Sequence, residues 1–187
     1  MIGAGAVLEI GQRFGIAAFA VCLCSLASCG VLPNPSDPFD IAARTEISRD
    51  RYDGLWKALG PKVLPIGNNV VDSYRLRAFS KDRDFGRLTV AQLYVVADVN
   101  EWLFLNRAHA AGAAFHVTQI DREVAYCTEE RCTLRETVGV DLSIEQMRAL
   151  AAGPGFDVRI SGRRGSMTIF VPAAYFQGFL MAIGKAR

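Results

Sequence analysis

The sequence predicts an α+β fold, in which an antiparallel meander or sandwich-like sheet is accompanied by two short helices, the second at the C-terminus. The 187 residues are 51% apolar and 21% charged, which is typical of a folded domain. Between residues 70 and 140, alternating segments follow one another across short polar joins. Strands joined in this way pair antiparallel, because a parallel pair needs a long crossover. Two later segments have helical spacing, and no internal repeat or second domain is visible.

The first elements of the domain are the least distinct. Residues 53–59 have the spacing of a short helix, whereas residues 45–59 can also be read as an irregular strand that ends at Gly60 and Pro61. We favour the strand. A second short extended piece is then expected over residues 62–66.

The centre of the chain predicts a series of strands. Residues 74–79 alternate in polarity, residues 80–86 form a charged turn, and residues 87–98 are rich in Thr, Val, Leu and Tyr, so an antiparallel pair is expected. Residues 93–96 are apolar on both faces, which predicts a central strand covered on both sides. Further strands are expected over residues 102–108, 114–121, 123–127 and 132–140.

Two helices and a hairpin complete the predicted fold. Ser143 and Gln146 form a capping box, and a Gly-Pro-Gly sequence ends the helix that follows. Residues 156–161 and 166–171 predict a hairpin with a glycine-containing turn. Pro172 suits the start of a last helix. One face of that helix is expected to be apolar through Phe176, Phe179, Leu180 and Ile183.

The first thirty residues predict export. Arg13 precedes an uncharged stretch over residues 14–28, and this stretch ends in the small residues before Cys29. A basic residue, a short apolar run and a small-residue site describe a signal peptide. A membrane-spanning helix would need about 20 mainly apolar residues. Here the apolar run stops near Cys29 and prolines follow, so the signal peptide is the better interpretation.

The sequence Leu-Ala-Ser-Cys at residues 26–29 resembles the lipobox of bacterial lipoproteins. This resemblance implies removal of residues 1–28 as a signal peptide, with diacylglycerol on the Cys29 sulfur and a third acyl chain on its amine. Several acyl chains hold a protein on a membrane stably, whereas one binds marginally. Gly30 stands at the position where an aspartate would imply retention in the inner membrane. The resemblance therefore implies the outer membrane, with the domain facing the periplasm.

The resemblance also sets the expected domain boundaries. Residues 29–40 are expected to be the lipidated cysteine and a proline-rich linker, which stays extended and lets the domain stand off the bilayer. Residues 41–187 then form a single α+β domain. The strand succession and the segments 120–124 and 171–180 resemble uncharacterised proteobacterial lipoproteins and periplasmic proteins, over about residues 44–183. This second resemblance implies fold and location but no activity.

Two cysteines remain after cleavage at the lipobox. Cys127 and Cys132 flank four polar residues, and in an oxidising periplasm they predict a disulfide across a hairpin. Together with His109 and His116 they also have the composition of a zinc site. The histidines come first, however, and six residues separate them, which is not zinc-finger spacing. We therefore expect no metal and no other cofactor.

Few residues suggest a functional site. The 21 basic and 19 acidic side chains are nearly balanced, which argues against nucleic acid as a partner, and common catalytic motifs are absent from the sequence. Asp98, Asn100 and Glu101 provide too few oxygen ligands for calcium. The candidate anion site is a basic hairpin, whose guanidinium groups suit phosphate on lipid A or carboxylates on peptidoglycan. Its residues are Arg159, Arg163 and Arg164, and the alternative is a solvated turn.

Two functional hypotheses follow. The first is a non-enzymatic envelope module, anchored by Cys29, that binds a partner protein or envelope component through one sheet face or the arginine hairpin. The second is a periplasmic hydrolase with a dispersed site that contains His116, Asp121 and Glu123. A convergent pocket with His116 and a carboxylate would favour the hydrolase. An apolar groove under the C-terminal helix would instead indicate a small lipophilic ligand.

Overall fold

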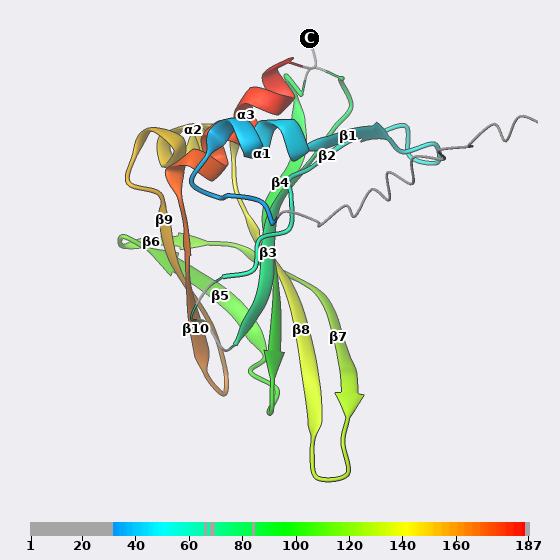
Figure 1. The fold of residues 1–187 in the computed structure, drawn as a ribbon, viewed down its shortest axis with the longest axis vertical. Helices are drawn as coiled ribbons and strands as arrows, with labels where there is room; N and C mark the ends of the chain where they lie inside the picture. Colours follow the sequence, from blue (N-terminus) through cyan, green and yellow to red (C-terminus); the bar gives the residue numbers. More distant parts are fainter. Residues whose placement is uncertain (1–31, 66, 68–69, 84, 186–187) are drawn as a thin grey trace, which may run out of the picture. The chain divides into compact units, whose positions relative to one another are not determined.

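A computed structural model describes residues 32–65, 67, 70–83 and 85–185, and in this part of the chain ten strands form two antiparallel sheets beside three helices (Figure 1). The predicted α+β class is confirmed. Sheet A has the strand order β1-β2-β3-β4-β8-β7, and sheet B has the order β10-β9-β5-β6. The strands of sheet A are β1 Glu46–Arg49, β2 Trp56–Leu59, β3 Val71–Ser80, β4 Leu88–Val99, β8 Cys132–Asp141 and β7 Val117–Cys127. Those of sheet B are β10 Ser166–Val171, β9 Phe156–Gly162, β5 Leu105–Ala110 and β6 Ala113–Phe115.

The strand connections differ from a simple meander. The pair β3 and β4 and the hairpin of β9 and β10 are confirmed. The chain leaves sheet A after β4, however, and the next strand, β5, pairs in sheet B with β9, about fifty residues later in the chain. The expected strands over residues 114–121 and 123–127 are also divided differently. Strand β6 ends at Phe115, and β7 then runs without interruption from Val117 to Cys127.

Glu136 fixes the point at which the chain leaves sheet A. This carboxylate is 1% exposed and accepts hydrogen bonds from the backbone N–H groups of Leu103, Phe104 and Leu105, at 2.5, 2.9 and 3.0 Å. Phe104 has a φ of 58°, in the left-handed region that a side chain rarely adopts. Arg122 donates to the same carboxylate at 3.2 Å. The buried charge is therefore satisfied while it holds a strained turn.

A helix occupies the beginning of the described chain, where the sequence suggested a linker. α1 spans Pro38–Arg44, and the Asp37 carboxylate accepts a hydrogen bond from the Phe39 backbone at its start. An acidic N-cap followed by proline at the first helical position is a helix-start signal that the linker interpretation overlooked. The expected strand over residues 45–59 is instead the hairpin of β1 and β2.

The two predicted helices are confirmed. α2 spans Ile144–Ala152 and begins with both hydrogen bonds of the capping box, and α3 spans Ala173–Lys185. Both α1 and α2 pack against α3 (Figure 1). Gly178 permits this packing, because a Cβ at that position would collide with the Pro38 carbonyl of α1.

One hydrophobic core joins the two sheets and the helices. Strand β4 is central in sheet A, as predicted, but it is covered on one side only: Leu93 and Val95 are fully buried, whereas Tyr94 and Val96 are half-buried on the opposite face. The side chains that are less than 2% exposed include Leu76, Leu105, Phe156, Ile160, Tyr175, Phe176 and Phe179.

Candidate functional site on the outer face of sheet A

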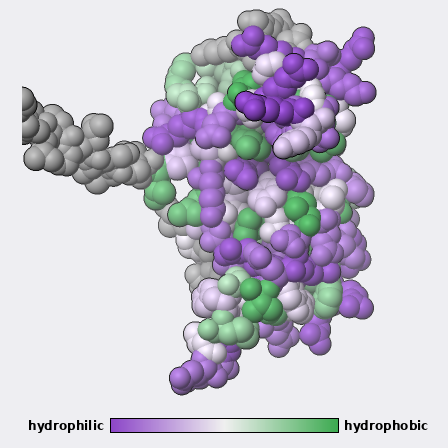
Figure 2. All heavy atoms as spheres, turned by 90° about the vertical axis from the view of Figure 1, so that its right-hand side faces the viewer, coloured by the Kyte–Doolittle hydropathy of each residue, from purple (hydrophilic) through white to green (hydrophobic). Residues whose placement is uncertain are grey.

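Polar side chains gather on the face of sheet A that lies opposite the core. Arg75 and Arg77 of β3, Gln92 and Tyr94 of β4, and Asp141 of β8 share this face, because residues two apart on a strand point to the same side. Arg77 lies opposite Gln92, which in turn lies opposite Asp141. We call this surface the polar face. The side of the molecule that carries β7 in Figure 1 is mostly hydrophilic, with small separate hydrophobic patches (Figure 2).

Asp141 is the centre of a hydrogen-bond network. Its Oδ1 accepts from Gln92 Nε2 at 2.5 Å, and its Oδ2 lies 2.5 Å from Nδ1 of His116. The Thr118 hydroxyl lies 3.4 Å from both carboxylate oxygens. The amide oxygen of Gln92 in turn accepts two hydrogen bonds from the Arg77 guanidinium. Side chains from the four strands β3, β4, β7 and β8, together with His116 just before β7, are therefore held in one arrangement.

Two arginines lie over the ring of Tyr94. The guanidinium carbons of Arg77 and Arg75 lie 4.7 and 5.3 Å from its centroid, within the range of cation–π attraction. Burial lowers the pKa of Arg77, with the neighbouring Arg75 acting in the same direction, while Tyr94 and Asp141 act in the opposite direction. Arg77 nevertheless stays charged, because an arginine pKa lies far above neutrality. Tyr94 and the two arginines thus form a cationic, aromatic surface on β3 and β4.

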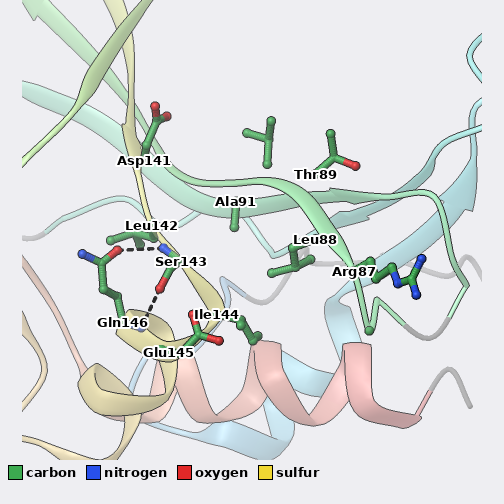
Figure 3. A pocket seen from close by; sticks show the side chains of 12 residues that line it. Arg87, Leu88, Thr89, Ala91, Asp141, Leu142, Ser143, Ile144, Glu145 and Gln146 are labelled. Atoms are coloured by element: carbon green, nitrogen blue, oxygen red, sulfur yellow. Dashed lines mark hydrogen bonds between the residues drawn. The ribbon is translucent and has the colours of Figure 1, made fainter.

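A cavity of about 550 Å³ adjoins this network (Figure 3). It lies between the start of β4 and the junction of β8 with α2, and Asp141 is on its edge. Figure 3 shows Leu88 and Ala91 pointing towards the helices, while Asp141 and Thr89 extend to the other side of the strands. Glu145, in the first turn of α2, has a pKa lowered by its own backbone N–H and by the Ser143 hydroxyl.

The structure separates the three residues of the expected hydrolase site. The carboxylate partner of His116 is Asp141, whereas Asp121 and Glu123 line a different hollow of about 300 Å³. His116 does not line the cavity beside Asp141, and its side chain is 76% exposed. Strand β7 also has a register shift between residues 119 and 121. It turns Asp121 towards Thr137 on the polar face, where simple alternation placed it on the opposite face.

The arginine hairpin has separate contacts for its side chains. Arg159 donates two hydrogen bonds to the Ser166 hydroxyl, at 3.1 and 2.9 Å, and the Arg163 guanidinium lies 4.5 Å from the centroid of Phe104. The backbone N–H of Arg164 donates to the Leu103 carbonyl. These contacts direct the guanidiniums of Arg159 and Arg163 to different partners. They favour the solvated turn, and the anion site stays a prediction.

The cysteine pair lies where the sequence placed it. Cys127 and Cys132 face each other at the end of the hairpin of β7 and β8, and their sulfur atoms are 2.01 Å apart. Both sulfurs are used in this bond, so neither cysteine is available to zinc. Within the described ranges, no group of three or more His, Cys, Asp or Glu side chains has the arrangement of a metal site. Cys29 lies outside the described residues.

Asp98, one of the three residues considered as calcium ligands, forms an ion pair with Arg135. Both carboxylate oxygens of Asp98 accept hydrogen bonds from Arg135 at 2.8 Å. This bidentate contact raises the pKa of Arg135. Asp98 therefore serves as the partner of a guanidinium on the polar face.

Comparisons with protein-family models, with curated proteins and with solved structures return no match for this chain. In the part of the chain that the structure describes, no helix is long and apolar enough to cross a membrane.

Proposed function

We propose that this chain is a lipoprotein of the bacterial cell envelope, anchored in the outer membrane through Cys29, whose periplasmic domain binds a partner protein without catalysing a reaction. The anchor rests on the lipobox resemblance of residues 26–29. The disulfide between Cys127 and Cys132 supports export, because disulfides persist in oxidising compartments such as the periplasm.

The polar face is the observation that carries the binding proposal. Its central side chains are fixed before any partner arrives, because Asp141 orients Gln92, and Gln92 orients Arg77 over Tyr94. Side chains that are ordered in advance lose less conformational entropy on binding. Such a surface therefore suits recognition better than a set of independent surface charges.

The chemistry of the polar face favours a protein as the partner. Tyrosine and arginine are enriched at protein interfaces and often supply most of the binding energy. The positive charge of Arg75 and Arg77 lies beside the negative charge of Asp141, Asp121 and Glu123 on the same face. A mixed pattern of this kind selects a partner surface with complementary charges in a matching order, whereas a simple polyanion would be repelled by the acidic side chains.

Photo-crosslinking in living cells tests this proposal. A photoreactive phenylalanine replaces Val90, which is 38% exposed and next to Gln92 on the polar face, and a matched probe replaces Arg164 on the arginine hairpin. We expect the Val90 probe to capture one envelope protein at a saturable yield. The second change Arg75→Glu should lower that yield several-fold, because it reverses a charge on the surface.

The controls separate the two surfaces. A protein with Arg159, Arg163 and Arg164 all changed to Ala should retain the capture by the Val90 probe. The proposal is overturned if the Val90 probe gives no saturable product, or if its product is unaffected by Arg75→Glu. If capture is lost in the triple alanine variant but not in Arg75→Glu, the binding site is on the arginine hairpin and not on the polar face.

The hydrolase is the second candidate, and the pairing of His116 with Asp141 is the observation that favours it. A carboxylate that orients a histidine is found in many acid–base sites. The exposed position of His116 outside the cavity opposes it. Equal turnover of chromogenic esters by the protein and by its His116→Ala variant would exclude catalysis of those esters by this pair.

A further inference from the structure

An apolar hollow lies where the described chain begins. Its volume is about 400 Å³, and it brings together the segment around Pro33 and Pro35, the segment that contains Leu64, and the end of β10 at Phe170. None of the described residues that line it carries a charge. Leu32, Leu64 and Phe170 lie at its edge and are 66%, 47% and 54% exposed. An apolar surface of this kind that faces water is typical of a site that contacts a protein, a membrane or a ligand.

The hollow is a fixed part of the domain. The backbone N–H of Asn34 donates to Asp40 in α1, and Ile41 of the same helix is fully buried against α3. On the opposite wall, Val63 is tied to Tyr74 of β3 by two backbone hydrogen bonds, at 2.9 and 3.0 Å. These contacts hold the walls in place although they come from distant parts of the sequence.

The sequence places this hollow close to Cys29. Only Gly30 and Val31 separate Cys29 from Leu32. Three residue steps span at most about 10 Å even when the chain is fully extended. The expected stand-off linker to residue 40 is in fact shorter, because the chain from Asn34 onwards is bonded to α1. An acyl anchor on Cys29 would therefore hold Leu32 within about 10 Å of the lipid surface.

We propose that this hollow is the surface by which the domain rests on the membrane, with Leu32, Leu64 and Phe170 in contact with the lipid leaflet that holds the anchor. The proposal rests on the acylation of Cys29 that was proposed above. Apolar side chains at the lipid boundary strengthen attachment in proportion to the area that they bury. Contact at a second point would also fix the orientation of the domain, which acyl chains on a free linker cannot do.

Site-directed spin labelling tests this contact. The full-length protein is purified with its anchor and placed in vesicles of phosphatidylethanolamine and phosphatidylglycerol. A nitroxide is attached to Phe170→Cys, and in a matched control to Val124→Cys. Val124 is 55% exposed and lies on β7, three strands away from β3 in sheet A. We expect the label at position 170 to collide several-fold more with lipid-soluble oxygen, and several-fold less with an aqueous nickel chelate, than the label at position 124.

The outcomes distinguish this inference from the lipoprotein proposal. The mass of the same sample shows first whether Cys29 carries acyl chains, and a protein without them contradicts the lipoprotein proposal. If Cys29 is acylated and both labels are equally accessible to nickel, the membrane contact alone is wrong. If the label at position 170 is equally shielded in a Cys29→Ser protein without vesicles, the hollow holds a small lipophilic ligand, and the contact is again contradicted.

Discussion

Gly139 leaves the space that the Gln92 side chain fills, since a Cβ built on Gly139 would lie 2.7 Å from both Cδ and Oε1 of Gln92. The two residues are on neighbouring strands of sheet A, and Gln92 is only 4% exposed. The same amide group joins Arg77 to Asp141. The small size of one residue therefore permits the central link of the network on the polar face.

Replacement of Gly139 by alanine should displace Gln92. We expect Gly139→Ala to lower the free energy of unfolding by about 1–3 kcal/mol, the usual cost of an added methyl group in a packed site. Chemical denaturation of the full-length protein measures this change. Gly184→Ala is the control, because nothing lies within 4 Å of a Cβ at Gly184. Equal destabilisation by both changes would contradict the role of Gly139.

Glu136 should be essential to the exit of the chain from sheet A. In Glu136→Gln, the backbone N–H of Leu105 and the Arg122 guanidinium lose their charged acceptor. We expect a loss of about 1.5–3 kcal/mol in the free energy of unfolding, because hydrogen bonds to buried charged groups contribute this much. Glu123→Gln, on the exposed side of β7, should change it by less than about 0.5 kcal/mol. A neutral effect of Glu136→Gln would show that the turn is held by other contacts.

The turn between β1 and β2 should withstand mild acid. Lys57 and the backbone N–H groups of Tyr52 and Asp53 lower the pKa of Asp50 from 3.8 to about 2. Since the folded-state pKa is the lower one, this contribution to stability is complete above about pH 3.8 and is lost as the pH falls towards about 2. An NMR titration of the Asp50 carboxyl carbon should show this pKa, and Lys57→Met should raise it. Lys62→Met, which removes the partner of Asp72, should leave it unchanged.

The disulfide should contribute modestly to stability. It closes a short loop between Cys127 and Cys132, so its removal gives the unfolded chain little additional conformational freedom. We expect the double change of both cysteines to serine to cost about 2 kcal/mol in the free energy of unfolding, the low end of the range for such bonds. Denaturation curves with and without the change measure it. A loss of more than about 5 kcal/mol would mean that the bond holds structure beyond its own hairpin.

Local elements could be predicted from the sequence because their signals lie within a few residues. The capping box of Ser143 and Gln146 begins α2 as predicted, and the hairpin of β9 and β10 needs only alternation and a glycine turn. Helix α1 had a usable signal in Asp37 and Pro38, although a proline-rich composition also suits a linker.

Long-range relationships could not be predicted, because they depend on packing between distant segments. Nothing near Glu136 in the sequence indicates that its carboxylate binds the backbone of residues 103–105. The pairing of His116 with Asp141 likewise spans 25 positions, and the register shift after Gln119 alters which side chains of β7 share a face. The sequence directed attention to His116 but not to its partner.

The state of Cys29 tests the central claim of this account most directly. The intact and peptide masses of the protein, isolated without reduction from the membranes of its own host, give that state. The account predicts an N-terminus at a triacylated Cys29, with Cys127 joined to Cys132. A chain that still begins at Met1, with free thiols at both of those cysteines, would contradict export, the anchor and the membrane contact together.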